Sequence, residues 1–333
     1  MHVVPGSVGG APGAHPALTR YLDLEQGSGR NKRESSGTAL RSAHIRVTPA
    51  RYLAATLRKE ATMQRTRPRT AGVLAFRQRC ALLALLGLFS ILVPPATASS
   101  EFGTVRQAFT QQVPRHLNLP ATTVTRYAGL LASALQADGL DAAAGDWVVL
   151  VDRNPRVQAA MVFARAGDGV SWRWVGATST STGKPGEFDH FITPVGVFDH
   201  SLENMDFRAE GTYNENGIRG YGVRGMRVYD FGWVDAERGW GKGGESQMRL
   251  QMHATDPDRL ESRLGRPASK GCVRIPAGLN RLIDRFGLID ADYVAAVERG
   301  DSLWVLAPDR TPVARPGRYL VIVDSGASPV SSQ

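Results

Sequence analysis

The residues best suited to chemistry in this chain are a histidine and a cysteine that lie close in sequence. His253 is followed, after fifteen intervening residues, by the run Ser269-Lys270-Gly271-Cys272-Val273-Arg274. A thiol reacts as the thiolate, and cationic neighbours such as Lys270 and Arg274 favour that form. A single cysteine is more often a small buried hydrophobe, but these neighbours favour a nucleophile. We therefore predict that Cys272 forms a covalent acyl intermediate.

The other parts of an acyl-transfer site have candidates nearby. His253 ends a predicted strand, which aims its side chain rigidly, and an imidazole titrates near neutral pH, so His253 is the predicted base. The backbone amides around Gly271 and Cys272 are the predicted oxyanion donors, because glycine lets a carbonyl oxygen approach closely. Arg274 shares a face with Cys272 if the segment is extended. Its guanidinium is then suited to binding a substrate carboxylate through two hydrogen bonds.

The remaining histidines are weaker candidates for chemistry. His190 and His200 each follow an aspartate, an arrangement that suits an oriented base or a metal ligand. However, the chain offers one thiolate and no close pair of ligands of the kind that structural zinc sites use. We therefore interpret both histidines as polar loop residues near turns, and we expect neither a metal site nor a cofactor.

Residues 63–98 have the order of parts that a secretory signal peptide requires. Met63 offers a start, the arginines after it give a positive region, and Cys80 to Val93 form an apolar run of 14 residues. Such a run is shorter than the roughly 20 residues that cross a bilayer, so we predict cleavage after Ala98 rather than a membrane anchor. Residues 1–62 are then either an over-extended gene model or a disordered extension. The mature chain is expected to be exported.

Charge and cysteine usage divide the chain at the same place. Residues 1–98 carry 14 Lys and Arg but 4 Asp and Glu, so that 26 basic and 27 acidic side chains remain after residue 98. The basic surplus belongs to the leader, and we expect no nucleic-acid binding by the mature chain and membrane contact only through the transient signal peptide. Loss of Cys80 leaves Cys272 as the only cysteine. In an oxidising compartment this indicates a reactive thiol or an intermolecular disulfide.

The elements that must position these residues are mainly strands. Residues 99–145 have apolar side chains at helical spacing and predict a helical segment. From Trp147 onward, short apolar runs between glycine, proline and aspartate predict strands. A late helix at 276–286 has one apolar face after a first-turn proline. The predicted fold class is therefore mainly β with a few helices (α+β). The predicted strands are 147–151, 157–163, 171–176, 196–199, 226–231, 248–253, 303–306 and 319–323.

Two motifs resemble those of the L,D-transpeptidase catalytic domain, or YkuD-like family. The first is His253 followed by the run from Ser269 to Arg274. The second, upstream, is Ser181-Thr182-Gly183 followed by Thr193-Pro194-Val195-Gly196-Val197-Phe198. The resemblance spans about residues 146–308 and implies a β-sandwich there. The helical segment precedes this domain, and a tail with one strand, residues 309–333, follows it.

The resemblance also implies an activity and, together with the signal peptide, a location in the periplasm. Cys272 would attack a diamino-acid carbonyl in a peptidoglycan stem peptide, release the terminal D-residue and pass the acyl group to the amine of an acceptor stem. His253 would be the base, held by a backbone carbonyl that here would be that of Ala254. Ser269 and Arg274 match the family's hydroxyl residue and its arginine. Many members carry histidine in place of Lys270, and often glycine in place of Ala254.

Three alternatives stay open at this stage. Water in place of an amine would make the enzyme an L,D-carboxypeptidase, or hydrolase of stem peptides. A non-catalytic cell-wall binding module would use Cys272 only for packing. Residues 201–244, with their tyrosines and tryptophans, are either a lid over the acyl site or a packed loop.

Overall fold

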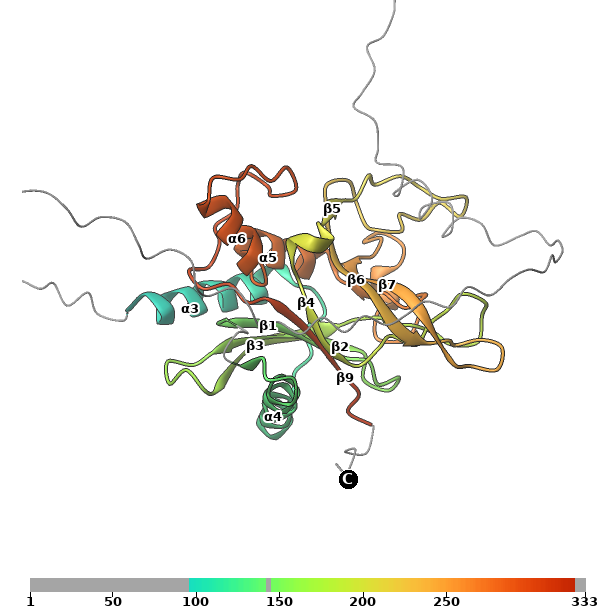
Figure 1. Cartoon of the computed structure of the whole chain (residues 1–333), viewed down its shortest axis with the longest axis horizontal. Coiled ribbons are helices and arrows are strands. Elements are labelled where there is room, and N and C mark those ends of the chain that lie inside the picture. The colour runs from blue at the N-terminus through green and yellow to red at the C-terminus, as the bar shows by residue number, and fades with distance from the viewer. Residues whose placement is uncertain (1–95, 142–144, 327–333) are drawn as a thin grey trace, which may run out of the picture. The chain divides into compact units, whose positions relative to one another are not determined.

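Two β-sheets that share one hydrophobic core form the centre of the fold (Figure 1). The computed structural model describes residues 96–141 and 145–326. One sheet has the strand order β3-β2-β1-β9-β4, and the other has the order β5-β6-β7-β8. The strands are β1 Trp147–Asp152, β2 Ala159–Arg165, β3 Trp172–Ser179, β4 Gly196–Asp199, β5 Phe207–Arg208, β6 Arg227–Glu237, β7 Glu245–Ala254, β8 Val273–Ile275 and β9 Tyr319–Val323.

Helices complete a mixed α/β architecture in which strands predominate. The α-helices are α3 Ala96–Gln112, α4 Ala121–Ala137, α5 Ala277–Phe286 and α6 Ala291–Glu298, and the short 3₁₀ helices are η2 Leu202–Asn204 and η3 Glu261–Arg263. The coarse prediction of two-sheet, mainly β structure with few helices is thus confirmed. No helix in the described part of the chain is long and apolar enough to cross a membrane.

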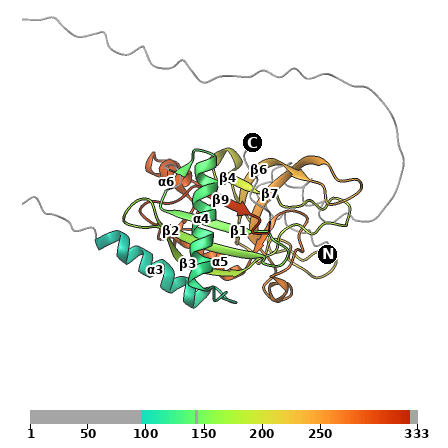
Figure 2. The ribbon, with the colours of Figure 1, turned by 90° about the horizontal axis from the view of Figure 1, so that it is seen from below.

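The five-stranded sheet is buried on both faces. On one face, Val149 of β1 joins the core shared with the second sheet. On the other face, Leu150 packs in a second cluster with Leu131 and Leu135 of α4, and Figure 2 shows this helix lying across the sheet. A strand that is covered on both faces has a sequence of consecutive apolar residues. This is why β1 could be predicted from the sequence.

The second sheet carries two different faces. Along β7, Met248, Leu250 and Met252 belong to the shared core, whereas the alternate residues are Arg249, Gln251 and His253. Successive strand residues point to opposite faces. The apolar half of β7 therefore anchors the strand, and its polar half is presented on the other face.

Several predicted elements need correction. The run 303–306 is not a strand: it lies in a turn, and the Val305 carbonyl accepts a hydrogen bond from Arg208 Nε at 2.7 Å instead of joining a ladder. Helix α6 was not predicted, because its buried side chains are only Tyr293 and Ala296. The predicted tail supplies β9, which pairs with β1 on one side and β4 on the other. This strand therefore lies inside the sheet, between β1 and the edge strand β4.

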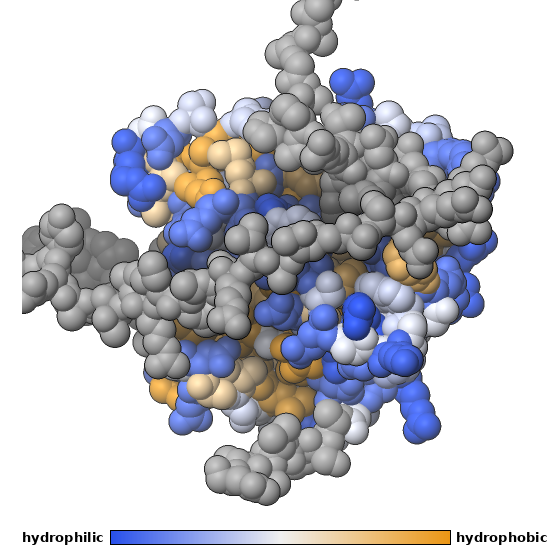
Figure 3. All heavy atoms as spheres, turned by 45° about the vertical axis from the view of Figure 1, so that its right-hand side comes forward, coloured by the Kyte–Doolittle hydropathy of each residue, from blue (hydrophilic) through white to orange (hydrophobic). Residues whose placement is uncertain are grey.

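The predicted helical segment consists of two helices that pack on different clusters, α3 on the shared core and α4 on the second. Residues 96–141 and 145–326 belong to one compact unit. Most of the predicted signal peptide, and residues 1–62, lie outside the described residues, and Ala96 to Ala98 form the first turn of α3. On the face shown in Figure 3, most of the described surface is hydrophilic, with smaller hydrophobic groups between.

A network of buried charges joins β6 to the helices behind it. Arg227 is fully buried, and its Nε donates to Asp206 Oδ2 at 2.5 Å while Nη1 donates to Asp290 Oδ2 at 2.7 Å. His200 is also fully buried, with Nε2 3.0 Å from Asp206. His200 is a loop residue directly after β4, as predicted. The sequence did not reveal that its ring is buried beside the carboxylates of Asp206 and Asp290.

We expect Arg227→Gln to destabilise the fold by about 3–5 kcal/mol, because it leaves buried carboxylates without a compensating charge. Urea unfolding followed by circular dichroism measures the change. Arg299→Gln is the matched control, since its ion pair with Asp301 is exposed and such pairs contribute about 0–1 kcal/mol. Equal stability of the two variants would contradict this prediction.

Candidate active site

The pairing of β7 with β8 brings the predicted catalytic residues together. The strands are parallel, and His253 stands opposite Arg274 in the register. Paired residues share a face of a sheet, as do residues two apart on one strand. Met252 and Val273 face the core. Cys272 directly precedes β8, and the alternation of an extended segment would place its side chain on the face of Arg274 and His253.

The His253 ring is held on two sides. Its Nδ1 donates to the Ala254 carbonyl at 2.7 Å, the partner that the family resemblance implied. The edge-to-face contact with Tyr221 has ring centroids 4.7 Å apart. With the proton on Nδ1, the Nε2 lone pair is the one that can accept a proton.

The imidazole of His253 is neutral at physiological pH. Its side chain is 2% exposed. Burial, and then the positive charge of Arg274, lower the pKa of His253 to about 3. A neutral imidazole can accept a proton, but a general base works best when its pKa lies near the working pH. With a pKa of about 3, His253 is a weak base until that pKa is raised.

Cys272 lies in the same buried region and is 5% exposed. Its Sγ lies 3.8 Å from the carbonyl oxygen of Arg249 on β7, with the thiol as donor. Its own carbonyl accepts a hydrogen bond from Ser269 Oγ at 2.6 Å. For His253 to remove the thiol proton, that proton must leave the Arg249 carbonyl.

The turn before Cys272 is fixed by Ser269 and Gly271. The Gly271 N–H donates to Ser269 Oγ at 3.1 Å, and its carbonyl accepts from Thr193 Oγ1 at 2.6 Å. Gly271 has a φ of 136°, and a Cβ here would come within 2.7 Å of Met248. The Gly271 N–H is therefore already used inside the turn. The role of the Gly271 and Cys272 amides as oxyanion donors stays a prediction. Glycine is required here by backbone geometry and by close packing.

The two cationic neighbours of Cys272 have different surroundings. Lys270 Nζ lies 3.5 Å from Asp189 Oδ2, so a carboxylate compensates part of the charge that was expected to favour the thiolate. Arg274 Nη1 donates to the Ala268 carbonyl at 3.1 Å. Its Nε is buried and has no hydrogen-bond partner among residues 96–141 and 145–326.

The two sequence motifs meet in space. The backbone of Ser181 forms an isolated β-bridge with that of Arg274, and Gly183 forms a second β-bridge with Ser269. Thr193, 78 residues before Gly271, donates to the carbonyl of that glycine. The upstream motif therefore supports the backbone that carries Cys272.

A polar network beside His253 was not predicted. Tyr221 Oη donates to Gln251 Oε1 at 3.2 Å, and Gln251 Nε2 donates to Asp230 Oδ2 at 3.0 Å. Arg249 Nε donates to the same carboxylate at 2.9 and 3.0 Å. Along β7, Arg249, Gln251 and His253 alternate with apolar residues. This alternation is visible in the sequence and could have predicted part of the polar network.

The aromatic residues of the stretch 201–244 differ in their burial and in their contacts. Tyr221 packs on the His253 ring, and Trp240 packs edge-to-face on Phe191 at 4.9 Å. Tyr213 and Trp233 are exposed. Only Tyr221 of these four residues contacts the predicted base among the ring contacts described.

The remaining histidine candidate is a loop residue. His190 Nδ1 lies 3.0 Å from the Lys184 carbonyl, within the loop before β4. In the described part of the chain, no group of three or more His, Cys, Asp or Glu side chains is arranged to hold a metal ion.

Comparison of the chain with protein-family models and with curated proteins gave no match.

We expect the His253 ring to remain neutral from pH 8 down to pH 5, because its folded-state pKa is about 3. Histidine ring NMR signals, assigned with the His253→Gln variant, measure the titration. The unfolded chain binds this proton near pH 6.5, so stability is lost as pH falls from about 6.5 towards 3. His253→Gln should weaken that pH dependence. A titration midpoint near 6.5 in the folded protein would contradict the burial of the ring.

Proposed function

We propose that this protein is an exported L,D-transpeptidase that acts on peptidoglycan stem peptides in the periplasm. The observation that carries the proposal is the register that sets His253 opposite Arg274, two residues after Cys272. Two further observations support it. The hydrogen bond from His253 to the Ala254 carbonyl orients the base, and the two family-like motifs are in contact. Two sheets around one core are compatible with the β-sandwich of that family.

In the proposed first step, His253 Nε2 takes the thiol proton as Cys272 Sγ attacks the carbonyl before the terminal D-residue. A C–S bond forms, and the C–N bond of the terminal D-residue then breaks. The imidazolium returns its proton to the leaving amine. The peptide remains on Cys272 as a thioester, and no external oxidant or cofactor is needed for this balance.

In the second step, the amine of an acceptor stem attacks the thioester. His253, neutral again, takes a proton from the attacking amine, and the thiol leaves with that proton. Because burial keeps the imidazole neutral between turnovers, it is available as a base for both partners.

We expect Cys272→Ala to abolish release of the terminal D-amino acid from a purified tetrapeptide stem. His253→Gln should slow that release by about 10²–10⁴-fold, the contribution typical of a general base. The released amino acid is quantified by chromatography. Arg281→Gln, an exposed helix residue, is the control and should retain full activity. Unchanged turnover in Cys272→Ala would reject covalent catalysis by this residue.

The products distinguish the proposed activity from hydrolysis. Incubation with tetrapeptide stems should give cross-linked dimers, detected by mass spectrometry, because an amine resolves the thioester. A product mixture containing only tripeptide would instead assign an L,D-carboxypeptidase. Binding of the stem without any product would assign a non-catalytic module.

A further inference from the structure

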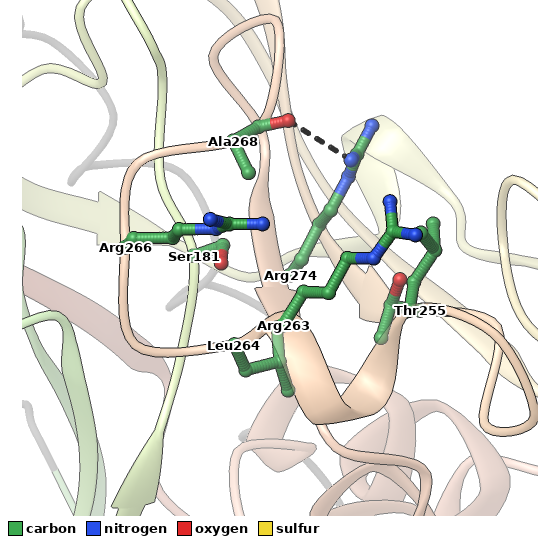
Figure 4. Close-up of a pocket in the computed structure, with 8 residues that line it drawn as sticks. Ser181, Thr255, Arg263, Leu264, Arg266, Ala268 and Arg274 are labelled. Atoms are coloured by element: carbon green, nitrogen blue, oxygen red, sulfur yellow. Dashed lines mark hydrogen bonds between the residues drawn. The ribbon is translucent and has the colours of Figure 1, made fainter.

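A cavity of about 150 Å³ lies beside the candidate active site (Figure 4). Three arginines line it: Arg263 at the end of η3, Arg266 in the following loop, and Arg274 of β8. Ser181 and Thr255 contribute hydroxyl groups. Arg274 stands opposite His253 in the strand register, so the cavity adjoins the face that carries the base.

Among the described residues, no carboxylate compensates the positive charge in this cavity. Within residues 96–141 and 145–326, none of the three arginines forms an ion pair, and no lining residue is acidic. The two nearest acidic residues in sequence are used elsewhere. Asp256 pairs with Arg219, and Glu261 accepts a hydrogen bond from the backbone N–H of Ala277 at 2.8 Å. Three like charges around one hollow repel one another unless an anion enters.

Unsatisfied polar atoms in the lining point to the same conclusion. Ser181 is 1% exposed, and its Oγ has no hydrogen-bond partner among the described residues. The Nε of Arg274 is likewise buried and unpartnered there. Buried polar groups are hydrogen-bonded in the large majority of cases, so a buried hydroxyl and a guanidinium NH that both line one cavity indicate a ligand with acceptor oxygens.

The chemistry of the lining favours a carboxylate. Guanidinium groups bind carboxylates through paired N–H···O bonds, and a serine hydroxyl can donate a further hydrogen bond. The cavity is several times larger than the roughly 30 Å³ that one water occupies in the liquid, which leaves room for a carboxylate with adjoining atoms. Arg263 and Arg266 are exposed, so the site is reachable from solvent.

We propose that this cavity, which we call the arginine pocket (Ser181, Thr255, Arg263, Arg266 and Arg274), binds a carboxylate of the peptide substrate beside the acyl site. The inference rests on the proposed function and names the part of the substrate that the chain recognises. Arg274 is then a binding residue shared by the pocket and the catalytic face, and Arg263 and Arg266 determine specificity for an anionic peptide.

Binding in the arginine pocket has a consequence for the base. The charge of Arg274 is the second cause, after burial, of the low pKa of His253. A bound carboxylate opposes that charge and raises the pKa of His253. Substrate binding therefore makes the imidazole of His253 a stronger base.

The test measures binding separately from turnover. The full-length Cys272→Ala variant is titrated calorimetrically with three tetrapeptides: one with all carboxylates free, one with a C-terminal carboxamide, and one with the side-chain carboxyl of its diamino acid amidated. The same titrations are made after adding Arg263→Gln and Arg266→Gln together. Arg281→Gln added to Cys272→Ala is the matched control, because Arg281 is exposed and lies outside the pocket.

We expect the double arginine substitution to weaken binding of the free acid by about tenfold to a hundredfold for each charged hydrogen bond lost. We expect one of the two amidated peptides to bind Cys272→Ala as weakly as the free acid binds the variant that also lacks both arginines. The carboxyl group that is amidated in that peptide is then the group that the arginine pocket binds. Loss of the two arginines should weaken the binding of that peptide little further. The control should bind like the parent.

Equal affinity of the parent and the double variant for the free acid would overturn the pocket assignment. Thioester formation on Cys272 in the otherwise wild-type chain, measured in parallel, keeps this result separate from the proposed function. Normal acylation with unchanged affinity rejects only the arginine pocket. Absence of both binding and acylation rejects the proposed function and the pocket together.

Discussion

The parallel pairing of β7 with β8 is the constraint on which the candidate site depends. Only three residues of β8 are paired, yet they set His253 opposite Arg274. A slip of one residue would turn every side chain of a strand to the other face, which would put Cys272 into the core. Met252, Val273 and Ile275 are fully buried and resist such a slip. The hydrophobic core therefore fixes the geometry of the polar face.

The charged groups of the protein fall into two classes according to their compensation. Arg227 is fully buried and is paired with Asp206 and Asp290, so its charge is part of the fold. Arg263 and Arg266 line a cavity without carboxylates. The charge of an arginine that is already paired with carboxylates needs no ligand. An arginine that lines a cavity beside buried polar atoms without hydrogen bonds indicates where a ligand could bind. This difference is why we assign structure to the first class and recognition to the second.

Local patterns in the sequence predicted much of the fold and the identity of the site residues. Strand β9 was predicted at its observed limits, and the helix ending at Phe286 was found from its apolar face. Contacts between distant residues could not be read in this way. The position of β9 inside the sheet depends on pairing with β1, and the use of the Gly271 amide depends on how the turn at Ser269 closes. Asp189, which pairs with Lys270, lies 81 residues away in sequence.

The most direct measurement is the intact mass of the protein after brief incubation with a tetrapeptide stem, followed by peptide mapping under acidic conditions that preserve a thioester. We predict that wild-type protein gains the mass of the acyl tripeptide at Cys272, and that His253→Gln gains it much more slowly. An adduct at any other residue, or equal rates in the two proteins, would contradict a site in which the imidazole on β7 activates the sulfur beside β8.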